Sequence, residues 1–413
     1  MRFNLQPCHW QLCTLLLAVH VCGAVPPQWT QLQAQDAHHG PAPRLGAASF
    51  SSGEIFFLQG GCSSSCCYAP LGDTWAYGKS GGWVNVSSTG GSAPSGRLYH
   101  GATAGGTASS FFVFGGNDVD TGFLDELWLV ALNMGAAPPS AQWQQVNTTT
   151  ARPPPRGSHS QNALPPAASG GAPPGSFVVF GGENDDGTLS DAWVFTPAAA
   201  GEGGAWRQLA PQAAPAGPGP RVQHAAVVIP LGGPGAGSVL IVSGGSDADG
   251  IDSDEVWALP LDTPSPPAWL LVGSSKPAAS GAAGAAAPGW PAARHGHALW
   301  GGGAPAGGGG VRLSLRLFGG QNSSVPDPGN FLGDLWQVEA TLGVGADGAL
   351  SLLGAPSCTL LSAGGGAGEP SPRALGGLAA VGGGGVVYAA GFSGYNGGND
   401  DRLWNDVWLT GSE

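Results

Sequence analysis

Short runs of β-branched and aromatic residues recur along the chain, and most of them end in a Gly-Gly pair. The pairs follow Gln59, Phe114, Phe180, Ser243 and Phe318, and a sixth run, Tyr388-Ala-Ala-Gly391-Phe392, has lost its second glycine. A run of this kind predicts a buried β-strand that ends in a sharp turn, because glycine adopts positive φ at no steric cost. The hydrophobic pattern therefore predicts many short strands joined by turns.

Each run is part of a longer repeat. Upstream of every glycine pair stands an arginine, usually after Pro: Arg44, Arg97, Arg156, Arg221, Arg294 and Arg373. Three residues further on come His100, His159, His224 and His297, with Ala47 and Gly376 in the first and last copies. After the glycines, an acid stands two residues before a Trp: Asp73/Trp75, Glu126/Trp128, Asp191/Trp193, Glu255/Trp257, Asp334/Trp336 and Asp406/Trp408. Trp83, Trp143, Trp206 and Trp269 open a further short apolar run, and Cys358 takes that place in the fifth copy.

Six copies of this pattern resemble the Kelch repeat family across essentially the whole chain after residue 24. The resemblance implies an all-β fold, a six-bladed β-propeller with four antiparallel strands, a to d, in each blade. The copies are longer than the roughly 50 residues of an ordinary Kelch repeat, so we expect the surplus Gly, Ala and Pro in loops. Arg312 and Arg316 depart from the pattern, because a middle strand between two blades should be apolar on both faces.

The two ends of the chain predict how the ring closes. The last repeat stops at Leu409 after three strands, whereas Trp29-Thr-Gln-Leu32 matches Trp83-Val-Asn-Val86, a fourth strand with no first three before it. We therefore expect the N-terminal strand to complete the last blade. The predicted division is a signal peptide at 1–24 and one propeller at 25–413, with blades at about 34–88, 89–150, 151–212, 213–274, 287–362 and 370–413 plus 28–33.

Composition agrees with a sheet fold and limits the partners. The 413 residues include 74 Gly and 36 Pro, and only 10% are charged. Each Gly within a helix costs about 1 kcal/mol and each Pro about 3, so long amphipathic helices are excluded. With 14 Lys+Arg against 27 Asp+Glu the net charge is −13, which disfavours nucleic acid and anionic membranes as partners.

The first 24 residues predict a secretory signal peptide. Arg2 is their only formal charge, an apolar run extends from Leu12 to Ala24, and Cys22 and Ala24 are small enough for a cleavage site. About 13 residues cannot span a bilayer of roughly 30 Å as a helix. The alternative is an apolar first strand. No later run of 18 apolar residues occurs, so we expect no membrane insertion and a secreted protein, or one in the secretory-pathway lumen.

In an oxidising compartment, the cysteines could form a disulfide and the acceptor sequences for N-glycosylation could be used. Cys62, Cys66, Cys67 and Cys358 remain after cleavage, and the first three form a cluster for which a small-loop disulfide is expected. Asn85-Val-Ser, Asn147-Thr-Thr and Asn322-Ser-Ser are acceptor sequences for N-glycosylation.

Strand alternation predicts the binding face. If neighbouring strands run in opposite directions, the d–a connections, the b–c loops and the start of strand a share one face. The six arginines should then ring the channel mouth within a rim of acidic b–c loops. Guanidinium groups pair bidentately with carboxylates, so a partner protein's acidic loop, an acidic glycan or an anionic metabolite would fit. Alternatively, each arginine pairs with loop acids or carbonyls and holds neighbouring blades together. We expect the four histidines to form hydrogen bonds to the backbone in the core, and the alternative is that they catalyse a reaction or bind a metal.

One acidic loop raises a calcium hypothesis. Asp247, Asp249 and Asp252 surround Gly250, which suits oxygen coordination. The pattern occurs once and lacks the Glu at the twelfth position, and the alternative is a solvated acidic loop.

Two functions compete. The first is a non-catalytic module that binds a protein or glycan without a cofactor. The second is an extracellular enzyme acting on an acidic sugar, similar to sialic-acid mutarotases, or a degenerate galactose oxidase-like protein. The mutarotase-like role needs an acid beside the arginine ring, for which Glu369 is the candidate. The oxidase-like role needs a Tyr/His copper set that five tyrosines do not supply. No phosphate loop, nucleophile elbow or zinc spacing appears, so the sequence favours the first.

Overall fold

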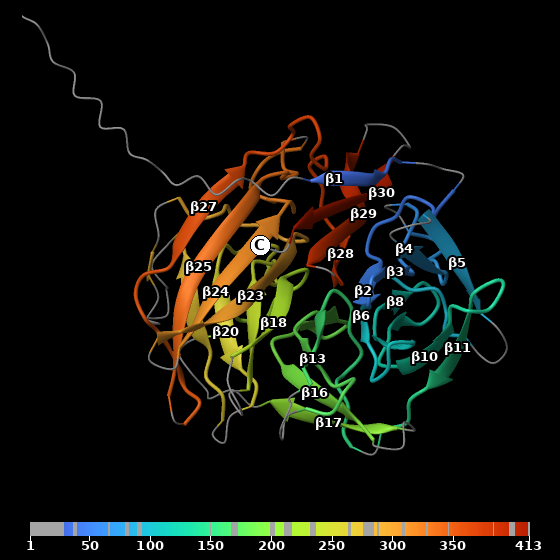
Figure 1. Cartoon of the computed structure of the whole chain (residues 1–413), viewed down its shortest axis with the longest axis horizontal. Helices are drawn as coiled ribbons and strands as arrows, with labels where there is room; N and C mark the ends of the chain where they lie inside the picture. Colours follow the sequence, from blue (N-terminus) through green and yellow to red (C-terminus); the bar gives the residue numbers. More distant parts are fainter. Residues whose placement is uncertain are drawn as a thin grey trace, which may run out of the picture.

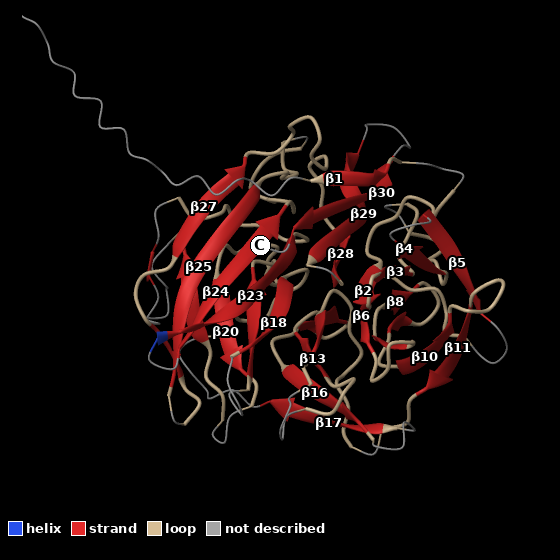
Figure 2. Ribbon diagram, viewed as in Figure 1, coloured by secondary structure: helices blue, strands red, loops and turns tan. Residues whose placement is uncertain are grey.

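The structure is a computed structural model, and it is all-β. It describes residues 29–411 except 36–38, 65–66, 79–81, 89–92, 149, 167–171, 199–202, 210–216, 232–236, 263–265, 276–284, 287–288, 308–309, 328, 346, 383 and 396–400. The predicted signal peptide and Cys66 lie outside these residues. Strands make up nearly all of its regular structure (Figure 2). Among the described residues, no helix has the length and apolar character needed to cross a bilayer.

Six blades stand around a common centre and form a propeller (Figure 1), and a short parallel pairing of the outermost strands joins blades 1 and 2 into one sheet. Blade 1 contains β2 (Ala48–Ser52), β3 (Ile55–Gln59), β4 (Thr74–Gly78) and β5 (Gly82–Ser88), and blade 2 contains β6 (Gly101–Ala104), β7 (Ser110–Phe114), β10 (Leu127–Asn133) and β11 (Ser140–Gln145). Blade 3 contains β12 (Ser160–Ala163), β13 (Phe177–Phe180), β16 (Ala192–Pro197) and β17 (Gly204–Leu209), and blade 4 contains β18 (Ala225–Pro230), β19 (Ser238–Ser243), β20 (Val256–Pro260), β21 (Leu270–Ser274) and the short β22 (Ala285–Ala286).

The last two blades are longer. Blade 5 contains β23 (Ala298–Ala306), β24 (Gly310–Phe318), β25 (Leu335–Val344), β26 (Leu350–Leu352) and β27 (Ser357–Ser362), and blade 6 contains β28 (Gly377–Val381), β29 (Gly385–Tyr395), β30 (Asp401–Gly411) and β1 (Thr30–Gln33). Two small hairpins lie in b–c loops: β8 (Asn117–Asp118) with β9 (Gly122–Phe123), and β14 (Glu183–Asn184) with β15 (Gly187–Thr188).

The ring closes as the sequence predicts. Strand β1 pairs antiparallel with β30, with Thr30 opposite Leu409 and Gln31 opposite Trp408, and the two lie side by side in Figure 1. Trp29 is buried, and its ring centroid lies 5.0 Å from that of Phe318 in blade 5. The N-terminal strand therefore completes blade 6 and also packs against its neighbour.

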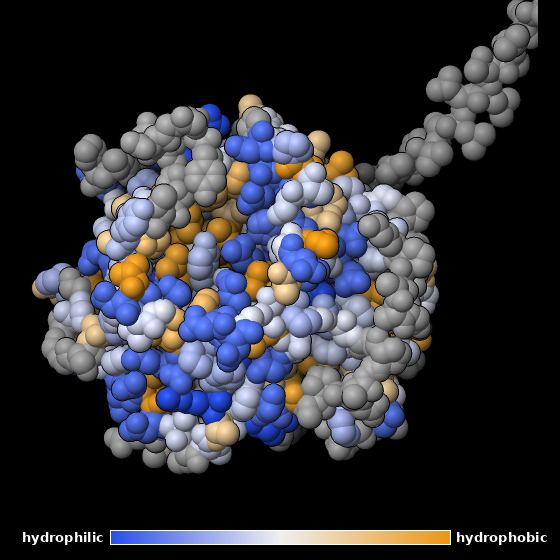
Figure 3. Space-filling view, turned by 180° about the vertical axis from the view of Figure 1, so that it is seen from behind, coloured by the Kyte–Doolittle hydropathy of each residue, from blue (hydrophilic) through white to orange (hydrophobic). Residues whose placement is uncertain are grey.

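The second strand of each blade forms the core between neighbouring sheets. All five residues of β7 and all six of β19 are buried, because each of these strands is covered by a blade on either side. Outside the core, hydrophilic side chains cover most of the face seen in Figure 3, and hydrophobic ones are scattered singly or in small groups.

The glycine pairs follow the second strands at a tight crossing. Gly60 and Gly61 have φ of 65° and 89°, and a Cβ on Gly61 would lie 2.7 Å from the carbonyl oxygen of Leu45. In blade 6 the replaced residue is the first of the pair, not the second as the sequence suggests. Ala390 has φ of 64°, and Gly391 N donates to Arg44 O at 3.0 Å, as Gly61 N does to Arg97 O at 2.8 Å.

Blade 5 shows why arginines occur in a middle strand. Strands β23, β24 and β25 have nine or ten residues each, and Arg312 is exposed where β24 runs opposite Thr341. Arg316 is buried, and its Nη1 donates to the carbonyl oxygen of Gly411 at 3.1 Å. This side chain joins blade 5 to the end of β30 in blade 6.

Candidate binding face

Every blade contains a buried cluster of arginine, carboxylate and tryptophan. In blade 3, Nη1 and Nη2 of Arg156 each donate to a carboxylate oxygen of Asp191 at 2.8 Å, and Trp193 Nε1 donates to Asp191 at 2.6 Å. The other ion pairs are Arg44–Asp73, Arg97–Glu126, Arg221–Glu255, Arg294–Asp334 and Arg373–Asp406. Each of these acids also accepts the indole N–H two residues later. The arginine and the acid-x-Trp motif are therefore one structural unit.

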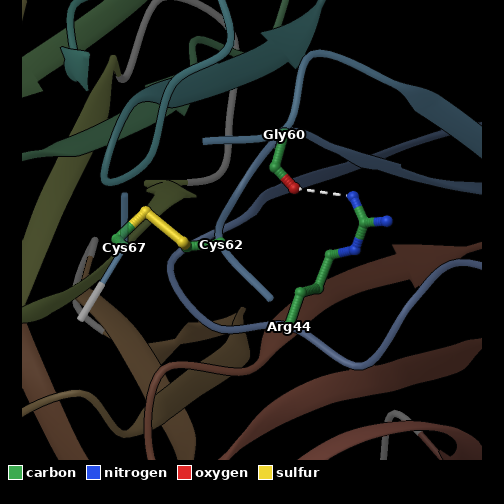
Figure 4. Close-up of a disulfide and its surroundings, with 4 residues drawn as sticks. All are labelled: Arg44, Gly60, Cys62 and Cys67. Atoms are coloured by element: carbon green, nitrogen blue, oxygen red, sulfur yellow. Dashed lines mark hydrogen bonds between the residues drawn. A yellow bond between two sulfur atoms is a disulfide. The ribbon is translucent and has the colours of Figure 1, made fainter. Parts of the chain in front are cut away.

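The same arginines connect each blade to the one before it. Arg44 Nη1 donates to the carbonyl oxygen of Gly60 at 2.8 Å within blade 1 (Figure 4). Its main-chain N donates to Trp404 O at 3.2 Å, and its carbonyl oxygen accepts from Gly391, so its backbone is attached to blade 6. Equivalent bonds link Arg97, Arg156, Arg221, Arg294 and Arg373 to the preceding blades. Each arginine thus binds its own blade through its side chain and the preceding blade through its main chain.

These contacts correct the expectation of an accessible arginine ring. The six arginine residues have at most 5% exposure, and none of them lines the cavity on the propeller axis. Burial raises the pKa of Asp191, but the hydrogen bonds and charge of Arg156, with the Trp193 indole, outweigh it and hold that pKa below its ordinary value. We therefore assign the arginines to blade packing, the alternative that the sequence left open, and not to an anionic ligand.

Main-chain groups, and not guanidinium groups, surround the axis. The residue two positions after each arginine has a positive φ: Gly46, Tyr99, Ser158, Gln223, Gly296 and Leu375. Each of the last five donates its N–H to the carbonyl oxygen of the preceding member of this set, at 2.7–3.0 Å. This collar narrows the axial opening to a cavity of about 150 Å³.

Four histidines line the same cavity and are held neutral. Burial, with the charge of the nearby Arg97, lowers the pKa of His100 to about 3, and burial lowers the pKa of His159 well below its ordinary value. His224 Nε2 lies 2.9 Å from Ser160 Oγ and His297 Nε2 lies 3.2 Å from Ser243 Oγ. Both ring nitrogens of His100 and of His159 are buried without a hydrogen-bond partner among the described residues, so the expected hydrogen bonds do not form at these two positions. Within the described part of the chain, no three His, Cys, Asp or Glu side chains are placed to hold a metal ion.

The b–c loops carry exposed acids and isolated apolar residues. Exposed carboxylates lie at Asp120, Asp185, Asp186, Asp247, Asp249 and Asp327. Between them, Tyr68, Val119, Ile251 and Val325 are 83%, 53%, 63% and 37% exposed. A cavity at blade 4 is lined both by its b–c loop and by the connections into blades 4 and 5, so these segments share one face, as strand alternation predicts. These apolar tips were not predicted, although single large apolar residues in loops of Gly, Ser and Asp are visible in the sequence.

Comparison with known proteins decides the family. Residues 79–287, just over half of the chain, match the model of the KLHDC2/KLHL20/DRC7 Kelch-repeats domain. The chain belongs to the Kelch-repeat family. No curated protein matches it in sequence. Among solved structures, the one titled "Structure of YjhT" is similar to this Kelch propeller with a TM-score of 0.51 and 12% identity, over 90% of this chain and 95% of that one. At this identity the likeness concerns the fold alone.

The carboxylates in the acidic loop of blade 4 form hydrogen bonds with different partners. Asp247 Oδ1 accepts from the main-chain N of Asp249 and of Ile251 at 3.0 and 2.9 Å, which shapes the turn. Asp252 pairs with His295 Nδ1 at 2.8 Å and also accepts from Ser246 Oγ at 2.6 Å. The three acids of the calcium hypothesis therefore do not converge on one point in this Kelch propeller.

The remaining predicted residues fall at scattered positions. Cys62 and Cys67 form a disulfide in the b–c loop of blade 1 (Figure 4), and Cys358 is a free, half-buried thiol in β27. Asn85 and Asn147 are exposed, whereas Asn322 is buried and its Oδ1 accepts from Ser324. The carboxylate of Glu369 accepts from Gly366 N at 3.0 Å, while Arg373 is paired with Asp406.

Proposed function

We propose that this Kelch propeller is a non-catalytic protein-binding module, and that its partner docks on the b–c loop face through a basic segment that also carries apolar side chains. The observation that carries the proposal is the alternation of exposed apolar tips and exposed carboxylates on one face.

The charge of the b–c loop face determines whether it attracts a basic or an acidic partner segment. If the six guanidinium groups were exposed to solvent, the mouth of the central channel would attract carboxylates. Each is instead neutralised within its own blade, so the exposed acids of the loops set the local potential. Arg152 stands on this face but pairs with Asp125 at 2.8 Å. A face of this composition attracts a positively charged segment and repels acidic loops, acidic glycans and nucleic acid.

The apolar tips supply the contact energy. Interfaces derive most of their affinity from a few large side chains that are fully desolvated on binding, and charges at the rim add on-rate and selectivity. Val119 lies between Asp118 and the exposed Asp120, and Ile251 lies between Gly250 and Asp252, so each tip can pack on an apolar partner residue while its neighbours meet a cation.

We also propose that the protein passes through the secretory pathway and is glycosylated at Asn85 and Asn147. The Cys62–Cys67 disulfide supports an oxidising compartment, and both asparagines are exposed in or after the outermost strands of blades 1 and 2. Asn322 is left out of this proposal, because its buried side chain is engaged in its own loop.

The test uses the mature chain, residues 25–413, immobilised for surface plasmon resonance. Two peptides of equal length are compared, one alternating Lys with Leu and the other Glu with Leu. We expect the basic peptide to bind and its affinity to fall as salt is raised from 50 to 500 mM, because exposed charges are screened within about 10 Å at 0.1 M salt.

Variants locate the binding. Val119→Ser with Ile251→Ser should weaken the basic peptide at least tenfold, whereas Leu353→Ser, an equally exposed residue of blade 5 outside the b–c loops, should change nothing. Preferential binding of the acidic peptide, or equal loss in the Leu353 variant, would overturn the proposal.

A further inference from the structure

A cavity on the proposed docking face lies between the b–c loop of blade 4 and the connection into blade 5. It measures about 630 Å³, within the range of ordinary ligand sites. Its lining combines Arg221, Asp247, Asp254, Glu255 and Trp290 with prolines from both connections.

Arg221 departs from the other five arginines in a way that concerns this cavity. In blades 1, 2, 3, 5 and 6 the arginine Nε donates to the carbonyl oxygen two residues earlier, as Arg44 does to Ala42 at 3.0 Å. In blade 4 that position is Gly219 with φ of 68°, and Nε of Arg221 is buried with no hydrogen-bond partner among the described residues. Its link to Glu255 is a single bond of 3.3 Å. The guanidinium is therefore the least engaged of the six.

The carboxylates around it are only partly used. Glu255 Oε2 accepts from Arg221, Ser253 and Trp257, but Oε1 has no partner among the described residues. Among the described residues, Asp254 accepts from Ser275 through Oδ2 only, and Asp247 accepts in its turn through Oδ1 only. Against one guanidinium the lining holds Asp247, Asp252, Asp254 and Glu255, an excess of negative charge even after Arg221 is counted.

We propose that this cavity binds the cationic side chain of an arginine or lysine belonging to the partner segment, a proposal that rests on the function proposed above. The cation is held by the free oxygens of Asp247, Asp254 and Glu255. Its aliphatic stem packs on Trp290, whose ring is fixed by a 2.7 Å bond from Nε1 to Asp254 O. Nε of Arg221 donates to a main-chain carbonyl of the same segment, the acceptor that Gly219 does not provide. Ile251 lines the rim of the cavity and is also one of the exposed apolar residues of the docking surface.

A small probe isolates the cavity from the rest of the interface. N-acetyl-arginine N-methylamide is titrated into the mature chain by calorimetry, beside the citrulline analogue, which has the same shape without the charge. We expect the arginine probe to bind at least tenfold more tightly, because charge-assisted hydrogen bonds are roughly twice as strong as neutral ones.

Matched variants identify the residues. Asp247→Asn with Asp254→Asn keeps one amide oxygen at each position for the existing turn contacts and should weaken the arginine probe about tenfold or more. Asp185→Asn with Asp186→Asn, exposed acids in the b–c loop of blade 3, should leave it unchanged. Thermal unfolding of both double variants checks that the fold is kept.

Gly219→Ala tests the role of Arg221. No atom of the described residues lies within 4 Å of the added Cβ, so the substitution opposes only the positive φ. We expect the backbone to adopt the conformation seen at Ala42, Arg221 Nε to gain its carbonyl, and the arginine probe to bind more weakly.

Equal binding of the citrulline probe, or full binding by the Asp247/Asp254 variant, would overturn this proposal. If either result is obtained while the wild-type chain still binds the Lys/Leu peptide, the docking face remains supported and only this cavity is excluded as the cation site. If the wild-type chain binds the arginine probe but not the Lys/Leu peptide, the proposed function is contradicted instead.

Discussion

Replacing Arg156 by alanine removes the centre of the blade 3 cluster. The side chain is fully buried and donates to Asp191 twice at 2.8 Å, to Gly181 O at 2.9 Å and to Pro154 O at 3.2 Å. The alanine variant keeps the main-chain bonds to blade 2, because they come from N and O of residue 156. The substitution therefore tests the guanidinium alone.

The expected loss of stability follows from what remains. Two carbonyl oxygens and the carboxylate of Asp191 lose their donors, and removal of one partner of a buried ion pair costs about 3–5 kcal/mol. Asp191 is 21% exposed and recovers some hydration, so we expect the lower part of that range. For a domain of this size, 3 kcal/mol corresponds to about 4 °C in Tm.

The assay is denaturant unfolding followed by tryptophan fluorescence, with Arg207→Ala as the control. Arg207 is an exposed arginine in β17 of the same blade, and its removal should change the free energy of unfolding by less than about 0.5 kcal/mol. A double variant with Asp191→Asn should recover part of the loss, since the unpaired charge is removed as well. Unchanged stability in Arg156→Ala, together with loss of anion binding, would show that the guanidinium serves a ligand and would refute our assignment.

Three further predictions concern other parts of the ring. Ala390→Gly should stabilise the protein by about 1 kcal/mol, because alanine at φ of 64° is strained; a loss on thermal unfolding would contradict this. Burial depresses the pKa of His159, so the stability it contributes is complete above pH 6.5 and declines as the pH falls toward the depressed value. His159→Gln should lessen the decline between pH 7.5 and 5.5 in denaturant titrations, and an unchanged slope would count against it. Trp29→Ala should cost about 3–5 kcal/mol and speed amide exchange in β30 more than in β13, whereas uniform exchange would mean that β1 does not close the ring.

Local chemistry repeated six times made the architecture predictable from sequence. The run before each glycine pair marks a strand, the pair marks the turn after it, and the unmatched strands at the two ends require closure between Trp29 and Leu409. Alternation of strand direction then places the b–c loops and the connections on one face. All of these inferences use residues within a few positions of one another, whose backbone preferences are intrinsic.

The direction of a long side chain is a different kind of property. Arg156 and Asp191 are far apart in the sequence, and an arginine before strand a reaches either the axis or its own blade from the same backbone position. The equal number of arginines and acid-x-Trp motifs, six of each, is a signal in the sequence that joins them.

The choice between the two directions is made by packing. A guanidinium facing the axis would meet the main-chain collar and the neutral histidines, whereas one facing its blade meets a carboxylate and a carbonyl oxygen at hydrogen-bond distance. Sequence alone thus determined the repeat, the closure of the ring and the position of its loops. Only the tertiary structure decided that the arginines are internal and leave no basic centre within the acidic rim, because the energy of a buried charge depends on which partner lies beside it in space.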